Sequence, residues 1–176
     1  LRKQKFDIDD EELKPYFQLE KVQEAVFGLA GKLFGLEFKE INDVQKYHSD
    51  VKTYEVSEVG SQKSEVSSEL QSSDFQHPTS DYKALLYTDY HPRKGKRAGA
   101  WMTSYKNQYK QNGENSRPHI SVVCNFTKPT KDTPSLLTFQ EVTTLFHEFG
   151  HALHGVLADT QYPNLSGTSV KWDFVE

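Results

Sequence analysis

The chain has 176 residues and a formal net charge of −4 at pH 7, and it is long enough for one domain with its own core. Charges of both signs are interspersed, so the composition excludes a strong basic field and predicts neither nucleic acid nor an anionic membrane as a partner. No stretch approaches the roughly 18 apolar residues of a membrane-spanning helix. Hydrophobic residues make up 35% of the chain, which is low for a complete globular domain and suits a piece of a larger protein or a chain with a polar insert.

The single cysteine, Cys124, cannot form an internal disulfide, which fits a reducing cytoplasm. Leu1 does not look like a natural start, so a missing targeting signal is uninformative and a periplasmic location stays open. Cys124 lies in an apolar alternating segment and is expected to be buried rather than nucleophilic.

An amphipathic helix is predicted near the N-terminus. Apolar residues recur at three- and four-residue steps from Leu19 to Leu33, and Gly35 is placed to end the helix. Residues 36–41 alternate apolar and charged side chains and are a predicted strand, as are residues 51–56.

Residues 57–80 differ in kind, since eight of these 24 residues are serine and the segment has no sustained period. Such a composition is typical of a low-complexity insert at the surface.

Three more strands are predicted before residue 127. Residues 82–90 are apolar on both faces near their centre, which favours an inner strand. Residues 100–105 are expected to return beside them as a hairpin with a long loop. A polar stretch with the turn signal Asn112-Gly113 follows. Residues 119–126 then alternate cleanly, with apolar side chains on one face.

The segment from Thr138 to His154 has independent evidence for a helix. Thr138 and Glu141 make a Thr-x-x-Glu capping box, and apolar residues recur from Val142 to Leu153 at helical spacing.

Within this helix lies the pattern His147-Glu148-Phe149-Gly150-His151. Residues four apart on a helix are separated by about 40° and about 6 Å, so His147 and His151 point the same way. Two such imidazoles can bind one Zn²⁺, while the Glu148 carboxylate lies where it can act as a general base on water. A histidine pair buried in the core is the alternative interpretation.

A zinc hydrolase needs a third protein ligand and an open position for water. The third histidine of metzincins, six residues after His151, is absent. His154 as a further ligand would close the site, so a structural hydrogen-bonding role is expected for it. Glu176 lies beyond a turn on a second predicted helix, residues 170–176, and is the candidate third ligand. Asp173, one turn before it, is a candidate acceptor for a ligand imidazole N–H or a cap of that helix.

The strand of residues 119–126 lies just upstream of the zinc-binding helix. Its residues Val123, Cys124 and Asn125 are candidates for pairing with an extended substrate backbone, and a purely structural strand is the alternative.

The segments HEFGHALH, SGT and DFVE, in this order and spacing, resemble the M3 family of zinc metallopeptidases, the thimet oligopeptidase and peptidyl-dipeptidase group. The resemblance extends to GAWM at residues 99–102 and RPHISVVCNF at residues 117–126, which look most like the bacterial peptidyl-dipeptidase branch. It covers roughly residues 82–176.

The resemblance implies one Zn²⁺ ion held by His147, His151 and Glu176, with Glu148 as catalytic base. It also implies short peptide substrates, cleaved internally or by release of C-terminal dipeptides, in a channel between two largely helical halves. A thermolysin- or neprilysin-like peptidase with a different third ligand, and a non-catalytic binding or structural domain, are the competing hypotheses.

The expected fold class is α+β and zincin-like, with an N-terminal amphipathic helix and a small mixed sheet that has an edge strand, as part of a larger, mostly helical enzyme. The family continues beyond the residue matching Glu176, so the chain is interpreted as one incomplete catalytic domain. Its parts would be helix and first strands (1–56), insert (57–80), sheet (81–136) and zinc-binding helices (137–176). The remainder of the same polypeptide would be its partner, and the isolated piece is expected to be weakly active or inactive.

Overall fold

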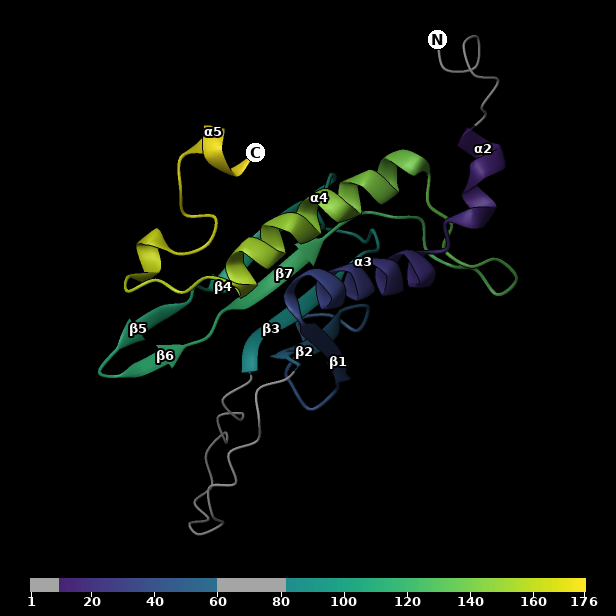
Figure 1. Ribbon diagram of the computed structural model, residues 1–176. Coiled ribbons are helices and arrows are strands. Elements are labelled where there is room, and N and C mark those ends of the chain that lie inside the picture. Colours follow the sequence, from purple (N-terminus) through teal and green to yellow (C-terminus); the bar gives the residue numbers. More distant parts are fainter. Residues whose placement is uncertain (1–9, 60–81) are drawn as a thin grey trace.

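The computed structural model describes residues 10–59 and 82–176, which form an α+β structure (Figure 1). Two helices, α3 (Leu19–Phe34) and α4 (Phe139–Val156), lie over one face of a five-stranded mixed sheet. The predicted α+β class with a small mixed sheet is confirmed. In sheet order the strands are β1 (Leu36–Ile41), β2 (Lys52–Glu58), β3 (Tyr82–Asp89), β7 (His119–Val123) and β4 (Trp101–Lys106). The shorter elements are α2 (Asp10–Leu13), η1 (Lys14–Tyr16), β5 (Tyr109–Gln111), β6 (Glu114–Ser116), η2 (Pro163–Leu165) and α5 (Trp172–Val175).

Helix α3 confirms the predicted N-terminal helix. Its buried stripe comprises Leu19, Val22, Val26 and Ala30, and Gly35 ends the helix in the left-handed conformation with φ of 65°. Glycine adopts this conformation without the steric cost of a side chain. The stripe is narrower than predicted, because Leu29 and Leu33 are exposed.

The strands lie close to their predicted positions, but one predicted pairing and one boundary differ. Strands β3 and β4 do not form a hairpin, because β7 lies between them, parallel to β3 and antiparallel to β4. Alternation within a strand reports which faces are buried and not which strand lies beside it. Strand β2 extends to Glu58, so the predicted insert starts too early. The rest of that insert, residues 60–80, lies outside the described residues.

The main hydrophobic core fills the space between the helices and the sheet. The rings of Phe27, Phe38 and Phe149 pack together there, with Phe149 5.7 Å between centroids from each of the other two. Strand β7 and the residues directly after it contribute the predicted apolar face, which comprises Ile120, Val122, Cys124 and Phe126. Helix α4 is therefore held against β7 and α3.

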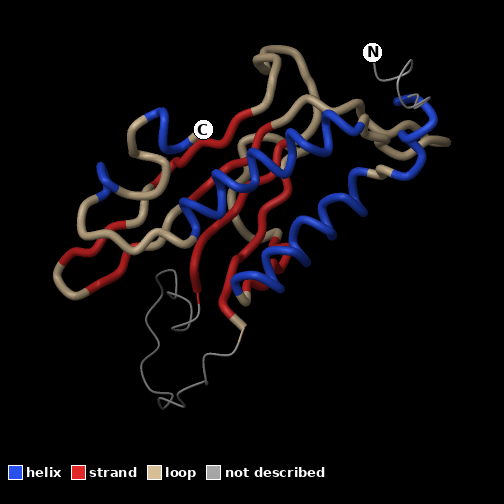
Figure 2. The backbone as a smooth tube through the Cα atoms, turned by 45° about the horizontal axis from the view of Figure 1, so that its top comes forward, coloured by secondary structure: helices blue, strands red, loops and turns tan. Residues whose placement is uncertain are grey.

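The polar stretch after β4 forms a small hairpin that the sequence did not predict. Strands β5 and β6 pair around Asn112 and Gly113, both with positive φ, as a two-residue hairpin turn requires. Figure 2 shows the hairpin projecting beyond one end of the sheet, beside the chain that follows α4. A backbone hydrogen bond joins the hairpin to this chain, because the Lys110 amide donates to the Gln161 carbonyl at 3.3 Å.

Candidate metal centre

Helix α4 presents its metal-binding pattern because its other side is buried. Thr138 caps it with the predicted capping box, in which the Thr138 hydroxyl accepts from the Glu141 amide and the Glu141 carboxylate accepts from the Thr138 amide. Leu145, Phe149 and Ala152 face the core. His147 is consequently exposed and His151 partly so, one turn apart.

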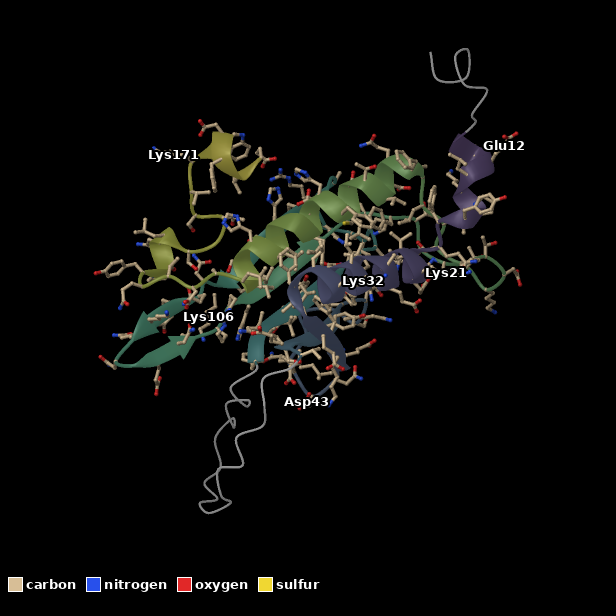
Figure 3. The ribbon with its side chains drawn as sticks, viewed as in Figure 1. Glu12, Lys21, Lys32, Asp43, Lys106 and Lys171 are labelled. Carbon is tan, nitrogen blue, oxygen red and sulfur yellow. The ribbon has the colours of Figure 1, made fainter. Side chains whose placement is uncertain are left out.

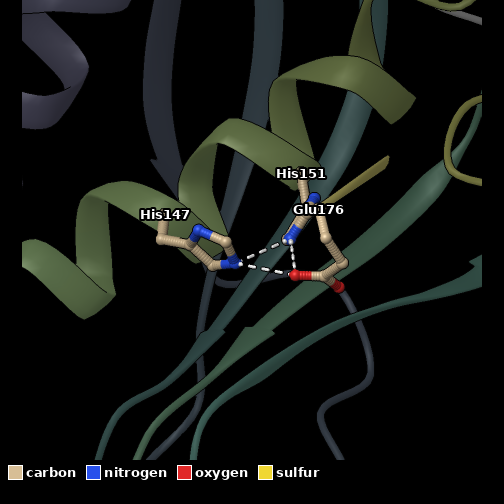
Figure 4. A group of neighbouring side chains, drawn as sticks. All are labelled: His147, His151 and Glu176. Atoms are coloured by element: carbon tan, nitrogen blue, oxygen red, sulfur yellow. Dashed lines mark hydrogen bonds and ion pairs between the residues drawn. The ribbon is translucent and has the colours of Figure 1, made fainter. Parts of the chain in front are cut away.

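The structure brings Glu176 to these two histidines (Figure 4). The Nε2 atoms of His147 and His151 are 3.0 Å apart, and Glu176 Oε2 lies 3.4 Å from the first and 3.9 Å from the second. Two ligand atoms about 2.0–2.1 Å from a tetrahedral Zn²⁺ are about 3.3–3.4 Å from each other. The three observed separations straddle this value, so this donor set fits one zinc ion.

Glu148 lies on the same helix, between the two histidines in sequence. Its side chain is largely covered, with 9% of the residue exposed, and no described residue forms a hydrogen bond or ion pair with its carboxylate. It is near Cys124, where burial and the Glu148 charge raise the pKa of the thiol to about 12. Cys124 is buried, as predicted, and its raised pKa keeps it a neutral thiol. The Glu148 carboxylate has no fixed hydrogen-bonding partner in the described part of the chain.

Comparison with known proteins connects this geometry to a family. The sequence profile of peptidase family M3 matches residues 1–176. This chain belongs to peptidase family M3. It is 41% identical to a dipeptidyl carboxypeptidase of Escherichia coli, over 100% of this chain and 23% of that protein. It is 36% identical to oligopeptidase A of the same organism and to a thimet-like oligopeptidase of Dictyostelium discoideum, over 97% and 98% of this chain and 23% of each relative. The chain therefore spans about a quarter of the length of these M3 relatives.

Two further residues predicted for the M3 site have other contacts. His154 is not among the clustered ligand atoms, and its ring packs against Phe174 with centroids 6.5 Å apart. No hydrogen bond from His154 occurs within the described residues, so its contact is aromatic rather than the predicted hydrogen bond. Asp173 forms no hydrogen bond with His147 or His151 in the described part of the chain, and Lys171 rather than Asp173 occupies the N-cap position of α5.

The contacts of Val123, Cys124 and Asn125 argue against their predicted pairing with a substrate backbone. Val123 pairs with both β3 and β4, so it has no open edge among the described strands, and the Cys124 amide donates to the Asp89 carbonyl at 2.8 Å. The Asn125 side chain donates to the carbonyls of Arg97 and Gly99, at 2.9 and 2.7 Å. Asn125 therefore anchors the loop before β4.

The open edge next to α4 is β4 itself. It pairs with β7 on one side, and no other described strand pairs with it. The predicted hairpin placed β4 beside β3, so the sequence did not indicate this edge.

No helix among the described residues of this M3 chain has the length and apolar character to cross a membrane.

Proposed function

We propose that this chain carries the zinc site of a zincin-like peptidase that hydrolyses peptide bonds in short oligopeptides. The observation that supports it most is the convergence of His147, His151 and Glu176 from two segments 25 residues apart, with Glu148 on the same helix as the two histidines. Two imidazoles and a carboxylate are the donor set of many catalytic zinc sites.

The chemistry divides between the ion and the chain. When bound, zinc supplies a Lewis acid that polarises a peptide carbonyl and lowers the pKa of water. His147, His151 and Glu176 would hold the ion, and the exposure of Glu176 and His147 leaves solvent access to the site. The Glu148 carboxylate would take a proton from the attacking water and pass it to the leaving amine.

Strand β4 would bind the substrate backbone in place of the strand first predicted. Its outer edge is unpaired within the described residues, and it lies beside α4, where Met102 packs near Gly155. An extended peptide could add to this edge by β-augmentation, which aligns its backbone along the metal-binding helix.

The relatives support the proposed substrate class. A dipeptidyl carboxypeptidase and an oligopeptidase A are both similar to the chain along nearly its whole length, which supports either release of C-terminal dipeptides or internal cleavage of small peptides. Because the relatives are about four times longer, further protein would supply the rest of a substrate channel. The aromatic side chains of α5, Trp172 and Phe174, are 78% and 75% exposed and are suited to such a contact.

The decisive test substitutes Glu148→Gln in the natural polypeptide that contains these residues. We expect zinc content to be retained and peptide cleavage to fall by about 10²–10⁴-fold, the usual contribution of a general base. The matched control is Glu114→Gln, which makes the same change at an exposed hairpin residue and should leave both quantities unchanged. Cleavage by Glu148→Gln at the unsubstituted rate would contradict the proposal and favour a non-catalytic domain.

A second substitution separates the competing peptidase class. Glu176→Gln should weaken zinc binding, because it replaces an anionic ligand with a neutral amide. Unchanged zinc affinity would mean that a different residue is the third ligand, as in the thermolysin- or neprilysin-like alternative.

A further inference from the structure

The third ligand depends on a segment that is not anchored through the main core. Residues 157–171 lead from α4 to α5, and Figure 3 shows Lys171 on the stretch that enters α5, away from Lys106 at the end of β4. No residue of α5 is buried. The placement of Glu176 therefore has to be fixed by contacts made earlier in this segment.

One buried side chain joins this segment to the end of β4. Gln108 is fully buried, and its Oε1 accepts from the Thr160 amide at 2.7 Å, the Thr160 hydroxyl at 3.1 Å and the Ser166 hydroxyl at 3.4 Å. Its Nε2 donates to the Thr160 carbonyl at 3.1 Å and to Asn115 Oδ1 at 2.8 Å. The carboxamide thus satisfies both of its N–H groups and holds two points of the returning chain, six residues apart.

Neighbouring contacts direct the segment that Gln108 holds. Arg117 donates to the carbonyls of Val156 and Ala158 at 2.6 and 3.1 Å, where α4 ends, and a cation is favourable at that end of a helix. Further along, Gly167 adopts φ of 56°, and a side chain there would lie 3.0 Å from the Gly155 Cα atom. The chain therefore turns back directly against the last turn of α4, toward the ligand histidines.

We propose that Gln108 is a positioning residue for the third metal ligand. By fixing Thr160 and Ser166, it sets the path of the returning chain so that Glu176 reaches His147 and His151. This rests on the proposed function, because it takes these three side chains to be the ligands. Gln108 itself touches neither the ligands nor a substrate.

The test measures zinc affinity by competition with a chromophoric chelator, on the natural polypeptide that contains these residues, with folding followed by circular dichroism. Gln108→Ala should weaken zinc binding by about 10- to 100-fold, the usual cost of removing a group that orients a metal ligand. The matched control is Gln111→Ala, which changes an exposed glutamine three residues further along, in β5. It should bind zinc like the unsubstituted chain. Ser166→Ala removes only the 3.4 Å contact, so it should fold normally and give a smaller loss in the same direction.

A double-mutant cycle distinguishes positioning from general destabilisation. If Gln108 acts through Glu176, Gln108→Ala should have almost no further effect on zinc affinity in a Glu176→Gln background, because the ligand it positions is already lost. An equal loss in both backgrounds would overturn the inference, and so would unchanged affinity of Gln108→Ala in a chain where Glu176→Gln is weakened. If Glu176→Gln binds zinc like the unsubstituted chain, the ligand set itself is wrong, and the inference is overturned with it.

Discussion

The two parts of the proposed metal site are held in different ways. The helix with His147 and His151 is fixed by burial, since Phe149 and its apolar neighbours pack against the sheet and α3. The returning segment, residues 157–176, is fixed by hydrogen bonds to residues 107–117. Side chains of Asn107, Gln108 and Arg117 donate to its backbone carbonyls, and the Gln161 side chain donates back to the Lys110 carbonyl. Several of its own apolar side chains are exposed: Tyr162, Leu165, Trp172 and Phe174.

Because of this difference, substitutions in one part should change mainly the stability of the fold, and substitutions in the other should change mainly the affinity for the metal. Burial of apolar area is the main source of folding free energy, so changes on the core side of α4 should affect the fold as a whole. Hydrogen bonds contribute less to stability but are directional, so changes in the returning segment should affect mainly where Glu176 lies. Each of the following predictions compares the two parts, and stability is measured by urea denaturation of the metal-free chain.

The largest difference is expected between two phenylalanines. Phe149→Ala should lower the free energy of unfolding by about 3–5 kcal/mol, because it leaves a cavity where the ring packs against Phe27 and Phe38. Phe174→Ala makes the same change at an exposed side chain of α5 and should alter it by less than about 0.5 kcal/mol. Similar losses in both variants would mean that the returning segment belongs to the cooperative core.

A buried and an exposed carboxylate give the next comparison. Asp89 is 2% exposed and pairs with Arg93 and with the buried Lys96, at 2.7 and 2.9 Å. Asp89→Asn leaves Lys96 without its counter-ion and should cost about 3 kcal/mol at pH 7. Asp159→Asn, which breaks the more exposed pair with Lys110 in the returning segment, should leave stability nearly unchanged.

The effect of Asp89 should also depend on pH. Burial opposes the ionised carboxylate, but hydrogen bonds from Arg93 and Lys96 outweigh it and lower the pKa of Asp89 from 3.8 to about 2. Because the folded pKa lies below the unfolded one, the carboxylate stabilises the fold above about pH 4, and this contribution is lost as the pH falls toward 2. The stability difference between the unsubstituted chain and Asp89→Asn should therefore shrink over that window. A difference that stays constant from pH 5 to pH 2 would show that Asp89 is not the responsible group.

The difference between the buried helix and the hydrogen-bonded returning segment also explains what could be predicted from the sequence. The helix of His147 and His151 has local signals, because the capping box and the apolar period lie within its eighteen residues and the N-cap residue just before them. The strand order has none, since β7 reaches its place between β3 and β4 through a crossover, and its alternating pattern suits any inner position.

The contacts that hold the segment of the proposed third ligand were the least accessible to prediction. Strands β5 and β6 have three residues each and are largely polar, so only the Asn112-Gly113 turn was visible. Gln108 is one glutamine in a polar stretch, and its burial depends on a chain segment 52 residues away. The hydrophobic period of a segment does not predict such contacts, because they form between residues far apart in the sequence.

The smallest predicted effect concerns Gly155, where the two parts of the site touch. A Cβ atom at Gly155 would lie 2.5 Å from Cδ1 of Ile120, which is fully buried in β7. Gly155→Ala should therefore lower the free energy of unfolding by about 1–2 kcal/mol, since overpacking costs more than the better helix propensity of alanine returns. Gly150→Ala is the matched control on the same helix, with nothing within 4 Å of its Cβ position, and should raise stability by about 0.5–1 kcal/mol.

A second change at the contact shows whether packing is the cause. Ile120→Val removes the Cδ1 atom and alone should cost about 0.5–1.5 kcal/mol. In the Gly155→Ala background it should instead be neutral or stabilising, because the alanine methyl group fills the vacated space. If the two costs simply add, the close approach of α4 to β7 is not what requires glycine at this position, and its contact with Gly167 in the returning segment becomes the remaining structural reason for it.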